Sequence, residues 1–345
     1  MKKNTQKTLI IAEISANHGQ DLDRAIRLIR SAKRCGVDVV KFQTYTPDTL
    51  TMDHRGACFT IRHPKWGGQT LYELYRQAYT PWRWFKRLKG IADREGLGFF
   101  STAFDPSSVD FLEDLGVSTH KIASFELVDI PLIEYMAATG KPLIMSTGMA
   151  SRKEIGRAMS AARSHGAGEI TLLKCVSSYP AVPEEMNLRT IPDMGRRFGC
   201  PVGLSDHSLS SAVPVAAVAL GASVIEKHFT LSRTIKTPDS FFSLEPAEME
   251  RLVQDVRNAE KALGAVSYAL TGGERKNSIF RRSLFVVKDI EKGERITGEH
   301  IRSIRPAHGI EPRFTKSVIG KVARRKLRRG TPLAFADLGR RRGRP

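Results

Sequence analysis

Eight short apolar runs constrain the fold of this chain more than any other feature of its sequence. They occupy residues 8–15, 37–45, 97–104, 119–125, 142–148, 170–177, 201–208 and 222–230, and amphipathic stretches separate them. Alternation of apolar runs with amphipathic helices is typical of βα units around a parallel sheet. Eight such units up to residue 264 predict a closed (β/α)8 TIM barrel of the α/β class rather than an open sheet.

The segments between the runs carry helix signals. Gly36 follows the last apolar position of DLDRAIRLIRSAKRCG, which is typical of a helix C-terminus. Ser151 and Glu154 have the spacing of a capping box at the start of another helix. We expect the last barrel helix to end at Gly264, and an insertion at roughly residues 51–80 interrupts the second unit.

The sequence changes in character after residue 265. A polar linker leads to a stretch with short apolar runs, glycine-centred turns and no long helical pattern. We therefore expect a barrel over residues 1–265, a linker over 266–283, a small β-rich domain over 284–339 and a basic tail over 340–345.

The positive charge of the chain, +19 in total, is concentrated near its end. Residues 321–345 contain ten lysines and arginines against the single acid Asp337. Such a cluster suits a nucleic-acid backbone, but it suits an anionic small molecule equally well. Because no recognisable nucleic-acid-binding module is present, we expect a small-molecule substrate and no nucleic-acid partner.

The cysteines and the N-terminus indicate the compartment. Four cysteines (Cys35, Cys58, Cys175 and Cys200) lie far apart without a CxxC pair, which argues against a disulfide framework or a zinc knuckle. The first apolar run is interrupted by Glu13, so we expect neither an export signal nor a membrane span. A cytoplasmic location is therefore expected.

Every apolar run ends in polar side chains. The carboxyl ends of the strands of such a barrel meet at one mouth, where the active site lies. A single buried lysine or histidine is usually a satisfied structural residue, but several charges at one mouth favour a binding site because each is costly to bury unless paired or ligated. The run ends supply Glu13, Lys41, Thr102, Lys121, Ser124, Glu126, Ser146, Ser177, Tyr179, Ser205, Asp206, His207, Glu226 and His228.

The residue types at this mouth indicate its ligands. Lysines and hydroxyls together suit a phosphate and a carboxylate, and here they are Lys41, Lys121, Thr102, Ser124, Ser146 and Ser205. His207 and His228 come from adjacent strands and can share one divalent metal that keeps positions open for substrate, although two histidines alone are a weak metal signal.

Several longer motifs resemble the bacterial sialic acid synthase family over nearly the whole chain. They are AEISANHGQDLDRA, KFQTYTPDTL, STAFDPSSVDFLEDLG, HKIASFE, STGMA, GLSDHS, EKHFTLSR, RRSLFVVKDIEKGERIT and RPAHGIEP. The resemblance implies a barrel followed by an antifreeze-like (SAF) domain. It also implies a metal-dependent condensation, with Mn²⁺ or Mg²⁺, of phosphoenolpyruvate with an N-acetylated hexose to a nine-carbon 2-keto acid.

Two segments resemble the pseudaminic acid synthase subgroup, whose sugar is 2,4-diacetamido-2,4,6-trideoxy-L-altrose. In KTPDSFFSLEP, Ser240 stands where neuraminate and legionaminate synthases usually have His, and the insertion carries the LYELY and TPxxW elements of the subgroup. Phe241 or Phe242 would then pack on the apolar end of the sugar or belong to the core. An N-acetylneuraminate or legionaminate synthase remains the alternative.

The resemblance also implies roles for individual residues. It assigns catalysis to Glu13, His207 and His228, with the two histidines as metal ligands. Phosphoenolpyruvate would contact Lys41, Thr102, Lys121, Ser124, Ser146, Ser177 and Ser205, where Ser177 departs from the Asn of neuraminate synthases. The sugar would contact Glu126, Tyr179, Asp239 and Arg305, and Arg305 would reach the barrel of the other subunit in a domain-swapped homodimer. A different enzyme class, an aldolase with a Schiff base at Lys121, is a further alternative.

Overall fold

The computed structural model describes residues 7–63 and 65–339 and divides the chain into two compact units. The first unit is Met1–Gly264 and the second is Ala265–Pro345. The predicted basic tail at residues 340–345 lies outside the described residues. The finer domain boundaries expected from the sequence stay predictions.

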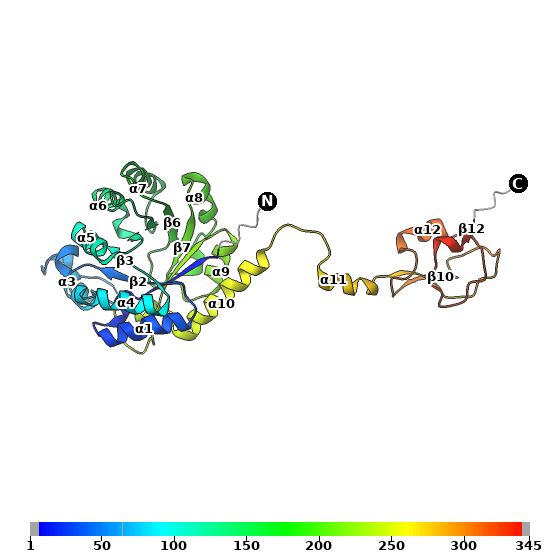
Figure 1. The fold of residues 1–345 in the computed structure, drawn as a ribbon, viewed down its shortest axis with the longest axis horizontal. Coiled ribbons are helices and arrows are strands. Elements are labelled where there is room, and N and C mark those ends of the chain that lie inside the picture. The colour runs from blue at the N-terminus through cyan, green and yellow to red at the C-terminus, as the bar shows by residue number, and fades with distance from the viewer. Residues whose placement is uncertain (1–6, 64, 340–345) are drawn as a thin grey trace. The chain divides into compact units, whose positions relative to one another are not determined.

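Eight parallel strands in the first unit close into a barrel, which confirms the predicted fold (Figure 1). Neighbouring strands pair in sequence order, and β1 closes the ring by pairing with β8. Each strand lies within the apolar run that predicted it. The strands are β1 (Leu9–Glu13), β2 (Val39–Thr44), β3 (Gly98–Ala103), β4 (His120–Ile122), β5 (Leu143–Ser146), β6 (Ile170–Cys175), β7 (Val202–Asp206) and β8 (Val224–His228).

Helices surround the strands and bury their apolar faces against them (Figure 1). Ser151 and Glu154 form the predicted capping box at the start of α7, and α10 ends one residue before Gly264. The helices that connect successive strands and close the barrel are α1 (Leu22–Arg34), α4 (Phe85–Glu95), α5 (Pro106–Leu115), α6 (Ile130–Ala137), α7 (Arg152–Ser164), α8 (Thr190–Phe198), α9 (Ala212–Ala219) and α10 (Pro246–Leu263).

The insertion forms an excursion between β2 and α4 that contains two further helices, α2 (Pro47–Leu50) and α3 (Leu71–Ala78). A capping box fixes the start of α3, because the Thr70 hydroxyl accepts from the Glu73 backbone N–H while the Glu73 carboxylate accepts from the Thr70 N–H. The excursion leaves the strand at its carboxyl end and therefore stands beside the barrel mouth.

The interior of the barrel is built in two layers. The lower layer is apolar and consists of Ile11, Val39, Phe100, Ile144, Leu173 and Val224. Side chains on a strand return to the same face every second residue. Two residues further along each of these strands the inward side chain is polar, namely Glu13, Lys41, Thr102, Ser146, Cys175 and Glu226. The strand pattern thus places a polar layer directly above the apolar one, and this polar layer forms the floor of the pocket described below.

The second unit is small and rich in short strands, as its sequence predicted. Strands β9 (Ser283–Val286) and β10 (Ile301–Ile304) form one antiparallel pair, and β11 (Val322–Ala323) and β12 (Leu338–Gly339) form another. The helices α11 (Gly272–Asn277) and α12 (Thr315–Val318) are short. Its core contains Leu284, Val286, Ile290, Ile296, Ile301, Ile310, Val318, Ala323, Leu327 and Leu333. Across the described residues of both units, no helix is sufficiently long and apolar to cross a membrane.

Candidate active site

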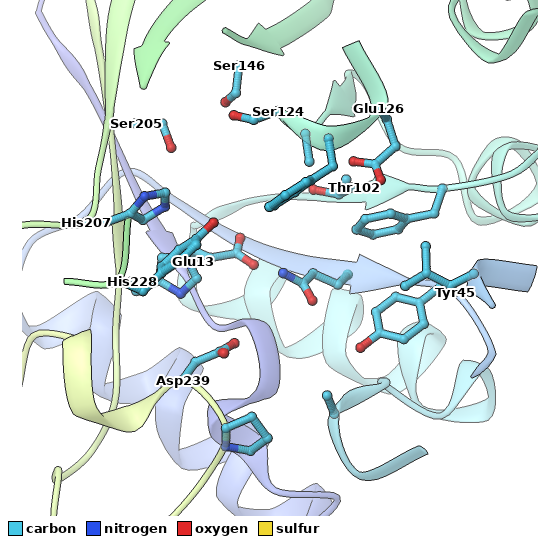
Figure 2. Close-up of a pocket in the computed structure, with 18 of the residues that line it drawn as sticks. Glu13, Tyr45, Thr102, Ser124, Glu126, Ser146, Ser205, His207, His228 and Asp239 are labelled. Carbon is cyan, nitrogen blue, oxygen red and sulfur yellow. The ribbon is translucent and has the colours of Figure 1, made fainter. Parts of the chain in front are cut away.

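A cavity of about 510 Å³ opens at the carboxyl ends of the barrel strands. Its volume falls within the usual range for small-molecule sites. Figure 2 shows side chains from several strands and the loops after them gathered around this pocket. The residues proposed from sequence that line it are Glu13, Lys41, Thr102, Lys121, Ser124, Glu126, Ser146, Tyr179, Ser205, His207, His228 and Asp239.

Lys41 lies at the centre of the polar floor of the pocket. The strand register places Glu13 opposite Lys41 on one side and opposite His228 on the other. The Lys41 ammonium lies 2.6 Å from Glu13 Oε2 and donates to Thr102 Oγ1 at 3.0 Å. Glu13 Oε1 is buried without a hydrogen-bond partner among the described residues, so one carboxylate oxygen is available to a ligand.

Lys121 forms a second cationic point on the same floor. Its ammonium donates to Ser146 Oγ at 2.7 Å and to the Ile122 carbonyl at 3.0 Å. Glu226 stands between the two lysines, 3.5 Å from Lys41 Nζ and 3.9 Å from Lys121 Nζ. Two ammonium groups thus share the charge of Glu226, and one positive charge remains for an anionic ligand when Glu13 is protonated.

Burial and neighbouring charges set the protonation of the two acids on the floor. Burial raises the pKa of Glu13 to about 7, even though Lys41 opposes this shift. Burial also acts to raise the pKa of Glu226, but Lys121 and Lys41 outweigh it and lower the pKa below its ordinary value. Glu226 is therefore a fixed anion near neutral pH, whereas Glu13 exchanges a proton in that range.

The pKa values of the two lysines also shift in opposite directions. Burial works against the charge of Lys41, but Glu13 and Glu226 raise its pKa above the ordinary value. Burial lowers the pKa of Lys121, which Glu226 only partly offsets. Lys41 is thus the more firmly charged of the two groups.

Hydroxyl groups around the lysines are oriented to donate outward. Thr102 Oγ1 and Ser146 Oγ accept from the lysine ammonium groups, and Ser124 Oγ accepts from the Gly148 backbone N–H at 3.1 Å. A hydroxyl that already accepts keeps its own proton for another partner. These three side chains can therefore donate to phosphate or carboxylate oxygens.

Gly148 keeps this hydroxyl cluster open. A Cβ at this position would lie 2.2 Å from Ser177 Oγ and 2.7 Å from Ser124 Oγ. Ser177 is absent from the pocket lining as described, but its hydroxyl approaches Ser124 across the Gly148 backbone. Ser177, which the sequence placed among the phosphoenolpyruvate contacts, thus lies beside the pocket rather than on its surface.

His207 and His228 lie next to each other, with ring centroids 5.3 Å apart. His207 Nδ1 is 2.8 Å from the Val176 carbonyl, and His228 Nδ1 is 3.1 Å from Ser15 Oγ. Burial and the nearby cationic groups hold the pKa of His228 well below its ordinary value, so this imidazole is neutral. With both Nδ1 atoms engaged, Nε2 is the nitrogen of each ring that a metal can take.

The donor set fits a divalent metal that is only partly held by protein. Within residues 7–63 and 65–339 no group of three or more His, Cys, Asp or Glu side chains is arranged to hold a metal ion. Two imidazoles at the edge of an open cavity nevertheless supply two nitrogen donors and leave the remaining positions to substrate oxygens and water.

Asp239 and Glu126 line the pocket above the floor (Figure 2). Asp239 Oδ2 accepts from the Ala16 backbone N–H at 3.1 Å, and burial raises its pKa. Burial also raises the pKa of Glu126 to about 7, and its Oε2 has no hydrogen-bond partner among the described residues. Both acids have oxygens that can accept from sugar hydroxyl or amide groups.

Two residues stand apart from this group. Asp206, which the strand-end rule also placed at the mouth, points to the opposite face of β7 and pairs with Lys227 at 2.5 Å. It does not line the pocket. Arg305 lies in the second unit, one residue after β10.

Some lining residues had no role in the site proposed from sequence. Glu226 and Gln43 are polar strand-end residues without an assigned role, and both line the pocket, each two residues from a proposed site residue on the same strand, His228 and Lys41. The period-two alternation of strands is the signal that would have assigned them to the inward face beside those residues. Trp66, by contrast, comes from the insertion and had no such signal.

Comparison with known proteins decides the family. The NeuB family model matches residues 28–268, and the SAF domain model matches residues 281–339. The chain belongs to the NeuB family. This confirms the resemblance to sialic acid synthases and the SAF domain expected at the end of the chain.

Relatives resemble this NeuB-family chain over nearly its whole length. Pseudaminic acid synthase of Helicobacter pylori is 42% identical over 97% of this chain and 99% of that protein. N,N'-diacetyllegionaminic acid synthase of Legionella pneumophila is 36% identical over 95% of this chain and 94% of that protein. The crystal structure of N-acetylneuraminic acid synthetase from Leptospira borgpetersenii superimposes with a TM-score of 0.71 at 33% identity, covering 79% of this chain and 90% of that one.

Proposed function

We propose that this protein catalyses the pseudaminic acid synthase reaction. It condenses phosphoenolpyruvate with 2,4-diacetamido-2,4,6-trideoxy-L-altrose to a nine-carbon 2-keto acid and releases phosphate. The observation that carries this proposal is the 42% identity to the Helicobacter pylori pseudaminic acid synthase over 97% of the chain. The legionaminic acid synthase of Legionella pneumophila is less similar, at 36% identity.

Phosphoenolpyruvate occupies the cationic floor in this proposal. The ammonium groups of Lys41 and Lys121 neutralise its phosphate and carboxylate. Hydroxyl groups complete the seat, and three of them, Thr102, Ser146 and Ser124, already accept from a lysine or a backbone N–H and so keep their protons for the ligand. Ser177 and Ser205 are the remaining hydroxyls proposed for the seat, and Ser205 would turn its proton from Glu226 to the ligand.

The aldehyde of the open-chain sugar lies beside His207 and His228. These imidazoles would hold Mn²⁺ or Mg²⁺, and a bound metal supplies Lewis acidity that makes the aldehyde carbon electrophilic. Ser15 and the Val176 carbonyl orient the two rings through their Nδ1 atoms. The metal proposal is tested by EDTA treatment and by His207→Ala and His228→Ala; full activity after EDTA would contradict it.

Glu13 handles the protons of the reaction. C3 of phosphoenolpyruvate forms a bond to the aldehyde carbon, whose oxygen takes up one proton, and water adds at C2 and gives up one. Cleavage of the bond between C2 and the phosphate oxygen, with transfer of the C2 hydroxyl proton to the departing phosphate, then leaves the 2-keto acid and inorganic phosphate. A carboxyl group with a pKa of about 7 gives and accepts protons efficiently near neutral pH.

The sugar is held above the floor by Glu126, Tyr179 and Asp239. Asp239 and Glu126 accept from its hydroxyl or amide N–H groups. Tyr179 packs against the His207 ring at 4.4 Å between centroids, so it borders the position of the aldehyde.

A domain-swapped homodimer completes the site in this proposal, with Arg305 of a second copy contacting the sugar. The loops after β4 to β7 expose an apolar rim around the mouth, formed by Phe125, Val128, Met149, Val182 and Leu209. Large exposed apolar patches mark interaction surfaces. The same proposal has no nucleic-acid or membrane partner and a cytoplasmic location.

Mixing two inactive variants tests the swap. His207→Ala destroys the barrel site, and Arg305→Ala removes the contribution of the second unit. In a swapped dimer, a mixed pair contains one intact site, so activity returns when the variants exchange subunits. If dimers with one subunit of each variant are shown to form and stay inactive, the swap is contradicted.

One observation favours a second candidate, an aldolase with a Schiff base at Lys121. Burial lowers the pKa of this lysine, which favours the nucleophilic amine. Against it, the Lys121 Nζ already donates to Ser146 Oγ and the Ile122 carbonyl. Borohydride trapping in the presence of pyruvate distinguishes the two, because only the aldolase gives a covalent adduct.

Phosphate release tests the proposed function itself. The purified protein with Mn²⁺ and phosphoenolpyruvate should release phosphate only when the diacetamido sugar is added, with one nine-carbon acid formed for each phosphate. Phosphate release with N-acetylmannosamine alone would favour the neuraminate alternative instead.

A further inference from the structure

The two halves of the pocket have different chemistry. The floor is charged, but one wall is entirely apolar or aromatic and comes from a single excursion of the chain between β2 and α4. It consists of Leu50, Ile61, Trp66, Leu71, Leu74 and Tyr75. Nothing in the condensation at the aldehyde carbon uses this wall.

The helix α3 presents this wall through its spacing. Leu71, Leu74 and Tyr75 follow at intervals of three and four residues, so they share one helix face. Tyr75 packs edge-on against Tyr45 at 5.7 Å between centroids, which ties the helix to the end of β2. The wall is therefore a fixed surface rather than a loose loop.

Trp66 joins the excursion to the loop that carries Asp239. Its Nε1–H donates to the Pro238 carbonyl at 2.8 Å, across 172 residues of sequence. Because the only polar atom of the indole is used there, the ring offers the pocket carbon surface alone. Trp66 thus stands next to the acid proposed to hold the sugar.

Aromatic rings extend this surface towards the histidines. Trp66 meets Tyr179 and Phe241 at 5.8 Å and Phe242 at 6.5 Å between centroids. Phe242 lines the pocket and packs on His228 at 4.7 Å. Phe241 does not line the pocket and supports Trp66 instead.

We infer that the wall around Trp66 determines the choice of sugar by receiving apolar groups, a C-methyl or the methyl of an acetamido group, at the end of the substrate away from its aldehyde. This inference rests on the proposed function, since it concerns the sugar of that reaction. Substrate hydroxyls at this end would lie against the carbon surface of Ile61, Trp66 and Leu71, which offers them no hydrogen-bond partner. Such a wall typically discriminates by about 10- to 100-fold.

The test compares two sugars in the wild type and in Trp66→Ala. For the wild type and Trp66→Ala, kcat/KM is measured with 2,4-diacetamido-2,4,6-trideoxy-L-altrose and with N-acetylmannosamine, together with the KM for phosphoenolpyruvate. Trp66→Ala should lower the ratio of the two kcat/KM values by about tenfold or more, mainly through a higher KM for the diacetamido sugar, while the KM for phosphoenolpyruvate stays unchanged.

Tyr72→Ala is the matched control. Tyr72 lies on α3 beside Leu71 but does not line the pocket, and its hydroxyl points to Asp48 at 3.4 Å. This variant should keep the wild-type ratio. If Trp66→Ala proves unstable in a thermal melt, Ile61→Ser, which places a hydroxyl on the same wall, should shift the ratio in the same direction.

The outcomes separate the inference from the proposed function. If the wild type uses the diacetamido sugar and the ratio is unchanged in Trp66→Ala, or in Ile61→Ser where Trp66→Ala is unstable, the inference is overturned and the proposed function stands. An equal loss with both sugars, or an equal change in the KM for phosphoenolpyruvate, also overturns it. If the wild type does not use the diacetamido sugar, the proposed function fails and the inference fails with it.

Discussion

A buried ion pair behind His207 gives a stability prediction whose size follows from the structure. Lys227 and Asp206 lie 2.5 Å apart with 1% and 0% of their side chains exposed. The Lys227 ammonium also donates to the Ser208 carbonyl, and Asp206 accepts from the Ser208 backbone N–H at 2.8 Å. Lys227→Met leaves the Asp206 charge buried without its partner, which should lower the free energy of unfolding by about 3–5 kcal/mol.

The prediction includes a rescue. Asp206→Asn removes the charge and keeps an acceptor for the Ser208 backbone N–H. The double variant, Asp206→Asn with Lys227→Met, should therefore recover most of the free energy of unfolding that Lys227→Met loses. Because Asp206 and Ser208 flank His207, catalytic activity should fall in the single variant and recover partly in the double variant. Urea unfolding followed by far-UV circular dichroism measures the change in the barrel.

An exposed pair provides the control. Lys89 and Asp93 on α4 lie 2.9 Å apart, but 26% and 54% of their side chains are exposed. Lys89→Met should therefore cost less than about 1 kcal/mol. The reasoning is refuted if Lys227→Met costs no more than Lys89→Met, or if the double variant is no more stable than the single one.

Three further predictions concern the barrel mouth. Burial lowers the pKa of His18 to about 4 from 6.5, so between these values the unfolded chain binds a proton at this residue that the folded chain does not. From pH 6.5 to pH 5 the wild type should therefore lose roughly 2 kcal/mol of its free energy of unfolding relative to His18→Gln in urea unfolding, because the buried acids Glu13 and Glu126 titrate alike in both proteins. Ser15 is buried with φ 44, and its hydroxyl contacts His228. Because glycine adopts a positive φ more easily than alanine, Ser15→Gly should be more stable than Ser15→Ala by about 1 kcal/mol. Both variants lack the hydroxyl that orients His228, so calorimetry should show Mn²⁺ binding about 10- to 100-fold weaker in both. Gly148→Ala should raise the KM for phosphoenolpyruvate by about tenfold or more, because the added Cβ lies 2.2 Å from Ser177 Oγ and displaces donors of the seat; an unchanged KM would contradict the seat.

The barrel was predictable because its strands carry two signals at once. Each run is apolar enough to be buried and turns polar near its carboxyl end. The order of the strands and the end at which their polar side chains gather therefore both follow from the sequence. Strand alternation also predicts which side chains form much of the floor, since Lys41 and Glu13 share the inward face with the apolar residues below them.

Other features required the three-dimensional structure. Asp206 and Lys227 occur among the same polar strand ends as Glu226, yet they point outward and satisfy each other. The pKa of Glu13 depends on burial beneath neighbouring strands, which no spacing reveals. The apolar wall depends on a contact between Trp66 and Pro238, which are 172 residues apart, and an insertion of this kind has no periodic pattern that places it over the mouth.

Product analysis in a competition experiment tests the central claim most directly. The protein is incubated with Mn²⁺, phosphoenolpyruvate and equal concentrations of 2,4-diacetamido-2,4,6-trideoxy-L-altrose and N-acetylmannosamine, and the acids formed are identified by mass. We expect the nine-carbon acid of the diacetamido sugar to dominate, with one phosphate released for each molecule. Consumption of N-acetylmannosamine alone, or no phosphate release from either sugar, would contradict the account.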